Sequence, residues 1–235
     1  MYFYLNHLLN LVIADTALET MPVKLFQHPS LKKIRNSGKK PTEILLDRTF
    51  HHFAILSSNL KDEYKRGRPD ILHIILLSAL ATPLFKNNHL KVFVHTINNQ
   101  VINVGDNLRI PKSYSRFEGL ILDLIKHKKI VSKDGCLLLE LKDNQSFSDL
   151  IEKHIRPDLI VGLSTNGVLK NFEHVCNELF QFENPCVVIG GFPKGHFSPE
   201  IESHLEKKYS ISNLKLEAHV VISRLLYEFE KINDS

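Results

Sequence analysis

Cysteine is scarce in this sequence, and its arrangement argues against two kinds of site. The 235-residue chain contains three cysteines, Cys136, Cys176 and Cys186, and no two of them form a C-x-x-C pair. An odd number of cysteines without such pairs argues against a disulfide framework and against a cysteine-ligated zinc site. We therefore expect the protein to occupy a reducing intracellular setting.

Other motifs that carry metal or nucleotide chemistry are missing as well. The thirteen histidines are scattered apart from His51-His52, and no H-E-x-x-H occurs, so we predict no metal site. Residues 162–166 have Asn where a nucleophile elbow requires Gly, which argues against a serine hydrolase. The glycine-rich residues 190–195 fit neither the P-loop nor the G-x-G-x-x-G dinucleotide pattern.

Long hydrophobic runs are absent too. The apolar residues 2–14 are broken by Asn6, His7 and Asn10, follow no basic leader, and are too short to span a bilayer. We therefore expect neither secretion nor a membrane anchor. The chain has no internal repeat or low-complexity tract, and 43% of its residues are hydrophobic against 24% charged. This composition is typical of a globular protein with a real core.

Acidic residues are missing from one stretch of the chain, although the net charge is only +4. Residues 21–42 contain six basic residues and no acidic one, and residues 109–133 contain seven basic residues against two acidic ones. A third basic group lies at residues 65–68. If the fold brings these stretches together, they form a positive face for a polyanion, of which nucleic acid is the commonest. For residues 32–40, solubility alone is an equally good explanation.

Strand-like and helix-like segments alternate along the chain, which predicts an α/β layer architecture with a mostly parallel sheet. We expect a single domain over residues 1–235, with a hairpin turn at Asn98-Asn99 and a local hairpin excursion at about residues 131–146. Buried strands are predicted at residues 10–14, 43–46, 90–96, 158–163 and 185–190. Helices are predicted at residues 71–80, 117–126, 147–154, 171–179 and 216–232.

Three loops in the last third of the chain are candidates for ligand binding. They comprise residues 164–167, 191–196 and 210–216, and each follows a strand-like run. In sheets of this kind, ligands bind at the carboxyl ends of the strands. The glycines at positions 190, 191 and 195 let a ligand approach the backbone, whose N–H and C=O groups can read an adenine edge.

The run KRGRPDILH at residues 65–73 places charged residues at a predicted helix start. Pro69 suits the first turn of a helix, where its missing N–H would have no partner. The guanidinium groups of Arg66 and Arg68 can bind phosphate, and the Asp70 carboxylate can accept a proton or orient a donor. The alternative interpretation is a capped helix start whose charges are solvated.

In their order and spacing, five segments resemble the ribosome-biogenesis pseudouridine methyltransferases of the nucleolar essential protein family. The resemblance covers about residues 11–229. The segments are KRGRPDILH (65–73), VHT (94–96), LRIPKSYSRFEGL (108–120), VIGGFPKGHFS (188–198) and ISNLKL (211–216). It implies a SPOUT-class fold, in which a mostly parallel sheet with helices on both faces carries a C-terminal trefoil knot. It also implies a homodimer that binds S-adenosylmethionine, methylates N1 of a pseudouridine in small-subunit rRNA, and assists assembly of that subunit.

Carried onto this sequence, the resemblance assigns a role to individual residues. Asp70 is our hypothesis for the catalytic residue that hydrogen-bonds the base or accepts its proton, with Arg68 fixing that carboxylate or a phosphate. A structural Asp70 that accepts backbone N–H bonds is the alternative. The implied rRNA contacts are Arg68, Asp70, Arg109, Lys112 and Arg116. The implied cofactor contacts, mostly through backbone, are Leu163, Gly190, Gly195, Ile211, Ser212, Asn213, Leu214, Lys215 and Leu216.

The chain departs from the family pattern at four positions. Lys112 stands where Arg is usual, Lys215 where Pro is common, and Lys194 and His196 differ from the residues expected around Gly195. Two other functions stay open, namely a non-catalytic rRNA-binding assembly factor and a SPOUT methyltransferase of another RNA base. The long N-terminal extension of many eukaryotic members is missing, so we expect an archaeal, cytoplasmic protein; a eukaryotic member would be nucleolar.

Overall fold

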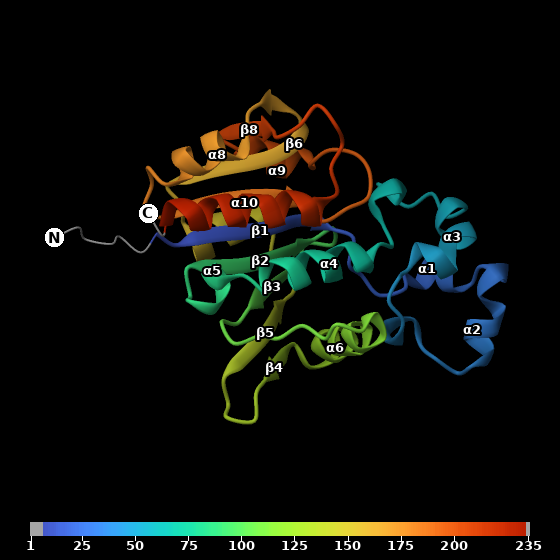
Figure 1. The fold of residues 1–235 in the computed structure, drawn as a ribbon. Helices are drawn as coiled ribbons and strands as arrows, with labels where there is room; N and C mark the ends of the chain where they lie inside the picture. Colours follow the sequence, from blue (N-terminus) through green and yellow to red (C-terminus); the bar gives the residue numbers. More distant parts are fainter. Residues whose placement is uncertain (1–6, 234–235) are drawn as a thin grey trace.

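The fold was analysed in a computed structural model that describes residues 7–233, so residues 2–6 of the apolar N-terminal stretch lie outside the described part. Eight strands form one mixed sheet in the order β4-β5-β3-β2-β1-β7-β6-β8 (Figure 1). Within residues 7–233, every helix is too short or too polar to cross a membrane.

The centre and one edge of the sheet are parallel. The central strand β1 (Leu9–Thr16) pairs with β2 (Leu90–Thr96) on one side and β7 (Pro185–Gly190) on the other. The next strand, β6 (Leu159–Leu169), lies between β7 and β8 (Lys207–Ser210). Four of the predicted strands are confirmed, and the bounds of β2 and β7 match their predictions.

The other edge of the sheet is antiparallel. β3 (Val101–Val104) pairs with β2 and with β5 (Leu137–Lys142), which pairs in turn with β4 (Lys129–Val131). The turn predicted at Asn98-Asn99 is confirmed, and Asn99 has the positive φ of 54° that tight turns require. Among the described strands, four pairings are parallel and three antiparallel, so the sheet is more mixed than predicted.

Alternation along β1 divides the main core into two layers. Leu9, Leu11 and Ile13 face the larger cluster, whereas Val12 and Ala14 face the smaller one. The larger layer is covered by α4 (Pro69–Ala79), α5 (Pro83–Lys86), α6 (Tyr114–His127), α8 (Phe172–Leu179) and α10 (Ala218–Asn233). The smaller layer is covered by α7 (Phe147–Asp149), by a π-helical turn that continues it over Leu150–Ile155, and by α9 (Pro199–His204). The five predicted helices are confirmed in place.

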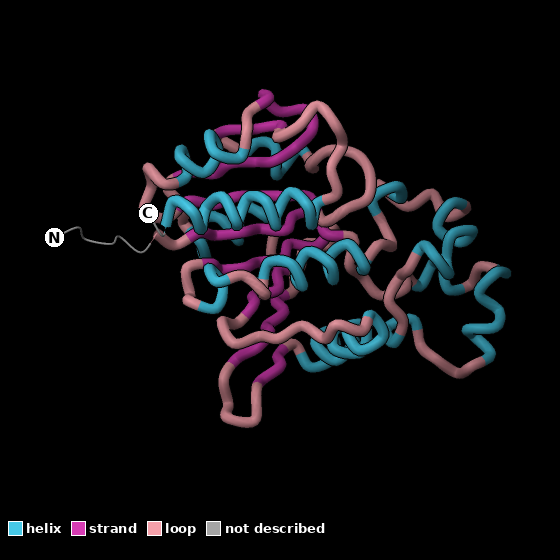
Figure 2. The backbone as a smooth tube through the Cα atoms, in the orientation of Figure 1, coloured by secondary structure: helices cyan, strands magenta, loops and turns pink. Residues whose placement is uncertain are grey.

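Between β1 and α4, the chain forms a helical lobe, which we define as residues 17–68. It contains α1 (Val23–Phe26), α2 (Lys32–Asn36) and α3 (Arg48–Leu56), and it projects from one end of the sheet without strands of its own (Figure 2). The strand predicted at residues 43–46 is therefore wrong. Ile44 and Leu46 are buried in the lobe's own core and Leu45 in the larger core layer, and their only ladder contact is an isolated bridge from Leu45 to Thr20. The run is apolar because it is buried in these cores, and the same apolar pattern also predicts a buried strand.

Candidate functional site

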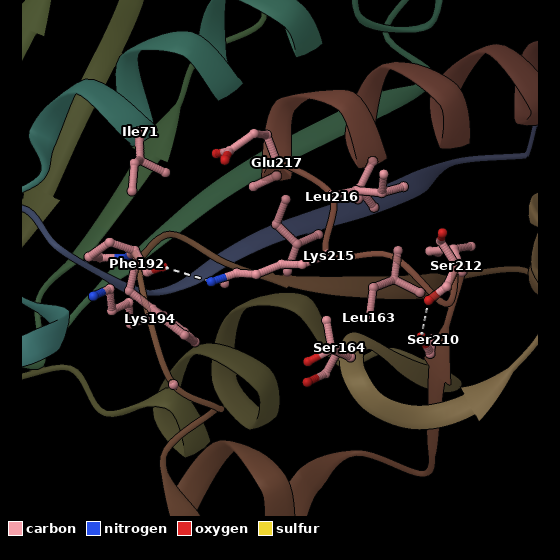
Figure 3. A pocket seen from close by; sticks show the side chains of 18 of the residues that line it. Ile71, Leu163, Ser164, Phe192, Lys194, Ser210, Ser212, Lys215, Leu216 and Glu217 are labelled. Carbon is pink, nitrogen blue, oxygen red and sulfur yellow. Dashed lines mark hydrogen bonds between the residues drawn. The ribbon is translucent and has the colours of Figure 1, made fainter.

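A cavity of about 240 Å³ opens between the sheet edge and the first turns of α4 and α10. It lies at the ends of β7 and β8 and beside β6, and Figure 3 shows side chains from these elements pointing into it. Carboxyl ends of parallel strands are the usual place for a ligand in an α/β sheet. The predicted cofactor residues that line the cavity are Leu163, Gly190, Gly195, Ile211, Ser212, Leu214, Lys215 and Leu216.

One predicted cofactor residue lies elsewhere. Asn213 lines a neighbouring hollow, which it shares with Leu169 and Leu214, and it is not among the residues that line the main cavity. The loop itself is braced on both sides, because the Ser210 hydroxyl donates to the Ser212 carbonyl at 3.0 Å and Lys215 Nζ lies 3.4 Å from the carbonyl oxygen of Pro193 (Figure 3).

Two glycines shape the wall of the cavity. Gly195 has a φ of +99°, and a Cβ added there would lie 2.7 Å from Cε2 of Tyr64. A Cβ added at Gly190 would lie 2.7 Å from Cε1 of Phe192. Contacts this short require either the aromatic ring or the loop to shift, so a side chain at either position would disturb the wall of the cavity.

The loop predicted at residues 164–167 is not a loop. These residues continue β6 as far as Leu169, and the pairing of β6 with β8 is broken between Leu163 and Val168. The break in the pairing lies beside the cavity, and Ser164 and Thr165 line the cavity. The prediction that these residues lie at a ligand site therefore agrees with the structure, although they belong to a strand. The polar strand β8 was not predicted, since its sequence KKYS has no apolar alternation.

Arg68 and Asp70 form a bidentate ion pair at the start of α4. Arg68 Nε is 2.8 Å from Asp70 Oδ1, and its Nη2 is 2.7 Å from Oδ2. The hydrogen bond to Asp70 raises the pKa of Arg68. Arg68 and Ile71 line the cavity, so Asp70 stands between two of its wall residues in sequence. No described backbone N–H donates to Asp70, and the alternative of a helix-capping carboxylate therefore lacks its contact.

The arginine-rich motif at residues 108–120 packs directly on this helix start. His73 of α4 donates from Nε2 to the carbonyl of Pro111 at 2.7 Å, and its ring stacks on Phe117 with centroids 4.5 Å apart. The Tyr114 hydroxyl donates to Asp47 of the lobe at 3.1 Å. Burial raises the pKa of Tyr114. The three predicted rRNA-binding residues of this motif, Arg109, Lys112 and Arg116, are exposed.

Two residues of the predicted basic surface point inward instead. Lys65 pairs with Asp15 at 2.9 Å, and Arg66 pairs with Glu19 at 2.6 Å, with little exposure of any of the four side chains. The turn at Gly67, whose φ is +71°, then directs the chain outward to Arg68. The expectation that residues 65–68 form one exposed basic group is therefore wrong for Lys65 and Arg66, because each has a buried acidic partner about 50 residues upstream.

Two side chains of the cavity were missed from the sequence. Phe192 and Glu217 both line it, Phe192 from the glycine loop and Glu217 from the residue before α10 (Figure 3). Phe192 lies inside the predicted loop at residues 191–196 and Glu217 inside the predicted helix at residues 216–232, but the sequence carries no signal that distinguishes their side chains from those of their neighbours. In the part of the chain that the structure describes, no three His, Cys, Asp or Glu side chains gather as metal ligands would.

The site thus combines a cavity at the carboxyl ends of parallel strands with exposed basic residues on a motif packed against α4, one of the helices that line it. Residues 11–230 match the family model of the EMG1/NEP1 methyltransferases, and the chain belongs to that family. The resemblance predicted from the motifs is thus confirmed.

Relatives with known names agree with this assignment. The chain is 40% identical to the ribosomal RNA small subunit methyltransferase Nep1 of Thermococcus sibiricus, covering 95% of this chain and 98% of that protein. It is 37% identical to the protein of the same name from Pyrococcus furiosus, over 94% and 96% of the two chains. Among solved structures, Archaeoglobus fulgidus Nep1 bound to S-adenosylhomocysteine superposes with a TM-score of 0.81 at 32% identity, covering 96% of this chain and 99% of that chain.

Proposed function

We propose that this protein transfers the methyl group of S-adenosylmethionine to N1 of a pseudouridine in small-subunit rRNA and assists assembly of that subunit. The observation that carries the proposal is a juxtaposition at the first turn of α4. The cavity lies on one side of this turn, the exposed Arg109, Lys112 and Arg116 belong to the motif packed against α4, and the Arg68–Asp70 pair belongs to the turn itself.

The residues of the cavity suit S-adenosylmethionine. Gly190 and Gly195 leave space that a Cβ would fill, and Leu163 and Ile189 offer apolar surface for an adenine ring. Leu163, Gly190, Gly195 and residues 211–216 would hold the molecule mainly through backbone groups. The contact of Asn213 stays a prediction, because this residue lines the neighbouring hollow.

When bound, the sulfonium supplies a methyl group that is electrophilic without help from a metal. The protein has to hold the base in line with that methyl group, exclude water and accept a proton. We assign the proton to Asp70: as N1 forms its bond to the methyl carbon and the carbon–sulfur bond breaks, the N1 proton passes to the carboxylate. Arg68 keeps both carboxylate oxygens oriented, at 2.7 and 2.8 Å.

The rRNA is held by charge and read at the base. Arg109, Lys112 and Arg116 are exposed, and no ion pair among the described residues occupies them. The two guanidinium groups can grip phosphates bidentately, whereas Lys112 offers a point charge. The target base has to leave the RNA stack to reach the cavity.

Three family properties belong to the same proposal. We propose that the segment from β6 to the loop at residues 211–216 forms the trefoil knot of the SPOUT class, and that the protein is a homodimer. The exposed apolar side chains Val168, Leu169 and Leu214, which lie beside the cofactor loop, support an interface there. The archaeal relatives support a cytoplasmic location.

A paired-substrate assay tests the reaction. An rRNA hairpin with pseudouridine at the target position is expected to accept a methyl group, whereas the same hairpin with uridine is not, because N1 of uridine is bonded to the ribose. Mass spectrometry of the nucleosides measures the product. Equal methylation of both hairpins would indicate another base, and cofactor binding without methylation would indicate a non-catalytic assembly factor.

Gly195→Ala tests the cofactor loop. We expect S-adenosylhomocysteine to bind about tenfold more weakly or worse, because the added Cβ combines backbone strain with the contact to Tyr64. Isothermal titration calorimetry measures the change. Gly135→Ala is the control, since its φ of +80° gives similar strain but no atom lies within 4 Å of the new Cβ. Equal affinities of the two variants would contradict the assignment of the loop.

Asp70→Asn tests the proton acceptor. Single-turnover methyl transfer is expected to fall about a hundredfold or more, while the affinities for RNA and S-adenosylhomocysteine change little. Asp106→Asn serves as the control, because Asp106 forms an ion pair of similar exposure with Lys91, at 2.6 Å. Near-normal turnover of the Asp70 variant with intact RNA binding rules out a proton-accepting role.

Arg116→Gln tests the rRNA surface. The affinity for the rRNA hairpin is expected to fall, and the slope of log affinity against log salt concentration to decrease by about one, because one phosphate contact is lost. Fluorescence anisotropy at several salt concentrations gives both values. Lys86→Gln, an exposed change on α5, should leave the slope unaltered. An unchanged slope in the Arg116 variant would place the RNA elsewhere.

A further inference from the structure

A buried ion pair that the mechanism does not use lies beneath the glycine loop. Lys65 Nζ is 2.9 Å from Asp15 Oδ2, and the two side chains are only 5% and 6% exposed. Removing two charges from water carries a large desolvation cost, and loss of one partner leaves the other charge uncompensated. Because separating this pair is costly, Lys65 and Asp15 keep fixed positions, and so do the residues that they contact.

Asp15 and the backbone on either side of it hold both ends of the loop at residues 190–198. At the start of this loop, the Gly191 N–H donates to the Ala14 carbonyl, and the Ala17 N–H donates to the Gly191 carbonyl, each at 2.9 Å. At its end, the Ser198 N–H donates to Asp15 Oδ2 at 2.7 Å, which is the same oxygen that Lys65 contacts. The last residues of β1 therefore clamp the loop at two points.

Lys65 and its neighbour Tyr64 hold the middle of the same loop. Lys65 Nζ lies 4.5 Å from the centroid of the Phe192 ring, in a cation–π contact. The Tyr64 ring lies against Gly195, where it would block a Cβ at 2.7 Å. Because Phe192 and Gly195 both line the cavity, these contacts set the shape of its wall.

The same short segment continues directly to the residues proposed for catalysis. After Lys65 come the buried Arg66–Glu19 pair and the turn at Gly67, and then the Arg68–Asp70 pair at the start of α4. A fixed position of Lys65 therefore fixes the cofactor loop relative to Arg68 and Asp70.

We propose that Asp15 and Lys65 are positioning residues, which lock the cofactor loop at residues 190–198 against the segment that carries Arg68 and Asp70. The inference rests on the proposed function, because it takes this loop as the binding site of S-adenosylmethionine. The affinity for the cofactor then depends on a charge pair that does not line the cavity and that is too buried to contact RNA.

Charge-removing variants of the full chain test the proposal. Lys65→Met keeps most of the side-chain volume, and Asp15→Asn keeps an oxygen acceptor for the Ser198 N–H. Each is expected to weaken S-adenosylhomocysteine binding about tenfold or more in calorimetry, within the range of couplings between contacting residues, and to leave affinity for the rRNA hairpin within about twofold. Lys65→Arg, which retains the charge, should restore most of the cofactor affinity.

The double variant Asp15→Asn with Lys65→Met separates positioning from folding. It contains no uncompensated charge, so it should fold even where a single variant does not, and its cofactor affinity should still be reduced. Lys91→Met, which breaks the surface pair with Asp106, is the matched control and should bind like the wild type.

Two outcomes overturn the proposal. Wild-type cofactor affinity in the single or double variants, even with a lower melting temperature, would show that the pair merely stabilises the fold and would overturn this inference alone. A wild-type protein that does not bind S-adenosylhomocysteine would overturn the proposed function and, with it, this inference.

Discussion

The contact of His73 with the motif at residues 108–120 is the interaction that holds the exposed basic residues of this motif beside α4. Its hydrogen bond to the Pro111 carbonyl and its stacking on Phe117 join α4 to α6, although the two segments are far apart in sequence. Without this junction, the exposed arginines would have no fixed position relative to the cavity. The exposed arginines and the wall of the cavity are thus joined by one buried contact, which salt screens less than an exposed one.

A second constraint acts from the opposite side of the same turn. The Tyr114 hydroxyl of α6 donates to Asp47 of the lobe. Within the lobe, the Arg48 N–H donates to the carbonyl of Gly67, two residues before α4 begins, so the lobe supports the start of α4. Lys65 and Arg66 add to these contacts, since Lys65 pairs with Asp15 in β1 and Arg66 pairs with Glu19, which follows β1. The first turn of α4 therefore has little freedom, which suits methyl transfer, because the methyl group and its acceptor have to be aligned.

Much of this arrangement could be predicted because it is encoded locally. The apolar runs of β2 and β7, the turn at Asn98-Asn99 and the glycines of the cofactor loop each carry a signal within a few residues. Features that depend on distant partners could not be predicted in this way. The direction of Lys65 is set by Asp15, and the apolar residues 44–46 are buried by helices rather than by a ladder. Side-chain direction and burial by another element are tertiary properties, which periodicity in one segment does not specify.

The central place of β1 also affects how the protein is made. β1 is synthesised before β2 and can pair with it early, but its other neighbour, β7, is synthesised only after β3, β4, β5 and β6. Until then, one edge of a fully buried apolar strand has no partner. Parallel pairings over such separations form slowly, and unpaired edges invite association with other chains. During synthesis, this edge of β1 is therefore open to association with other chains until β7 joins it.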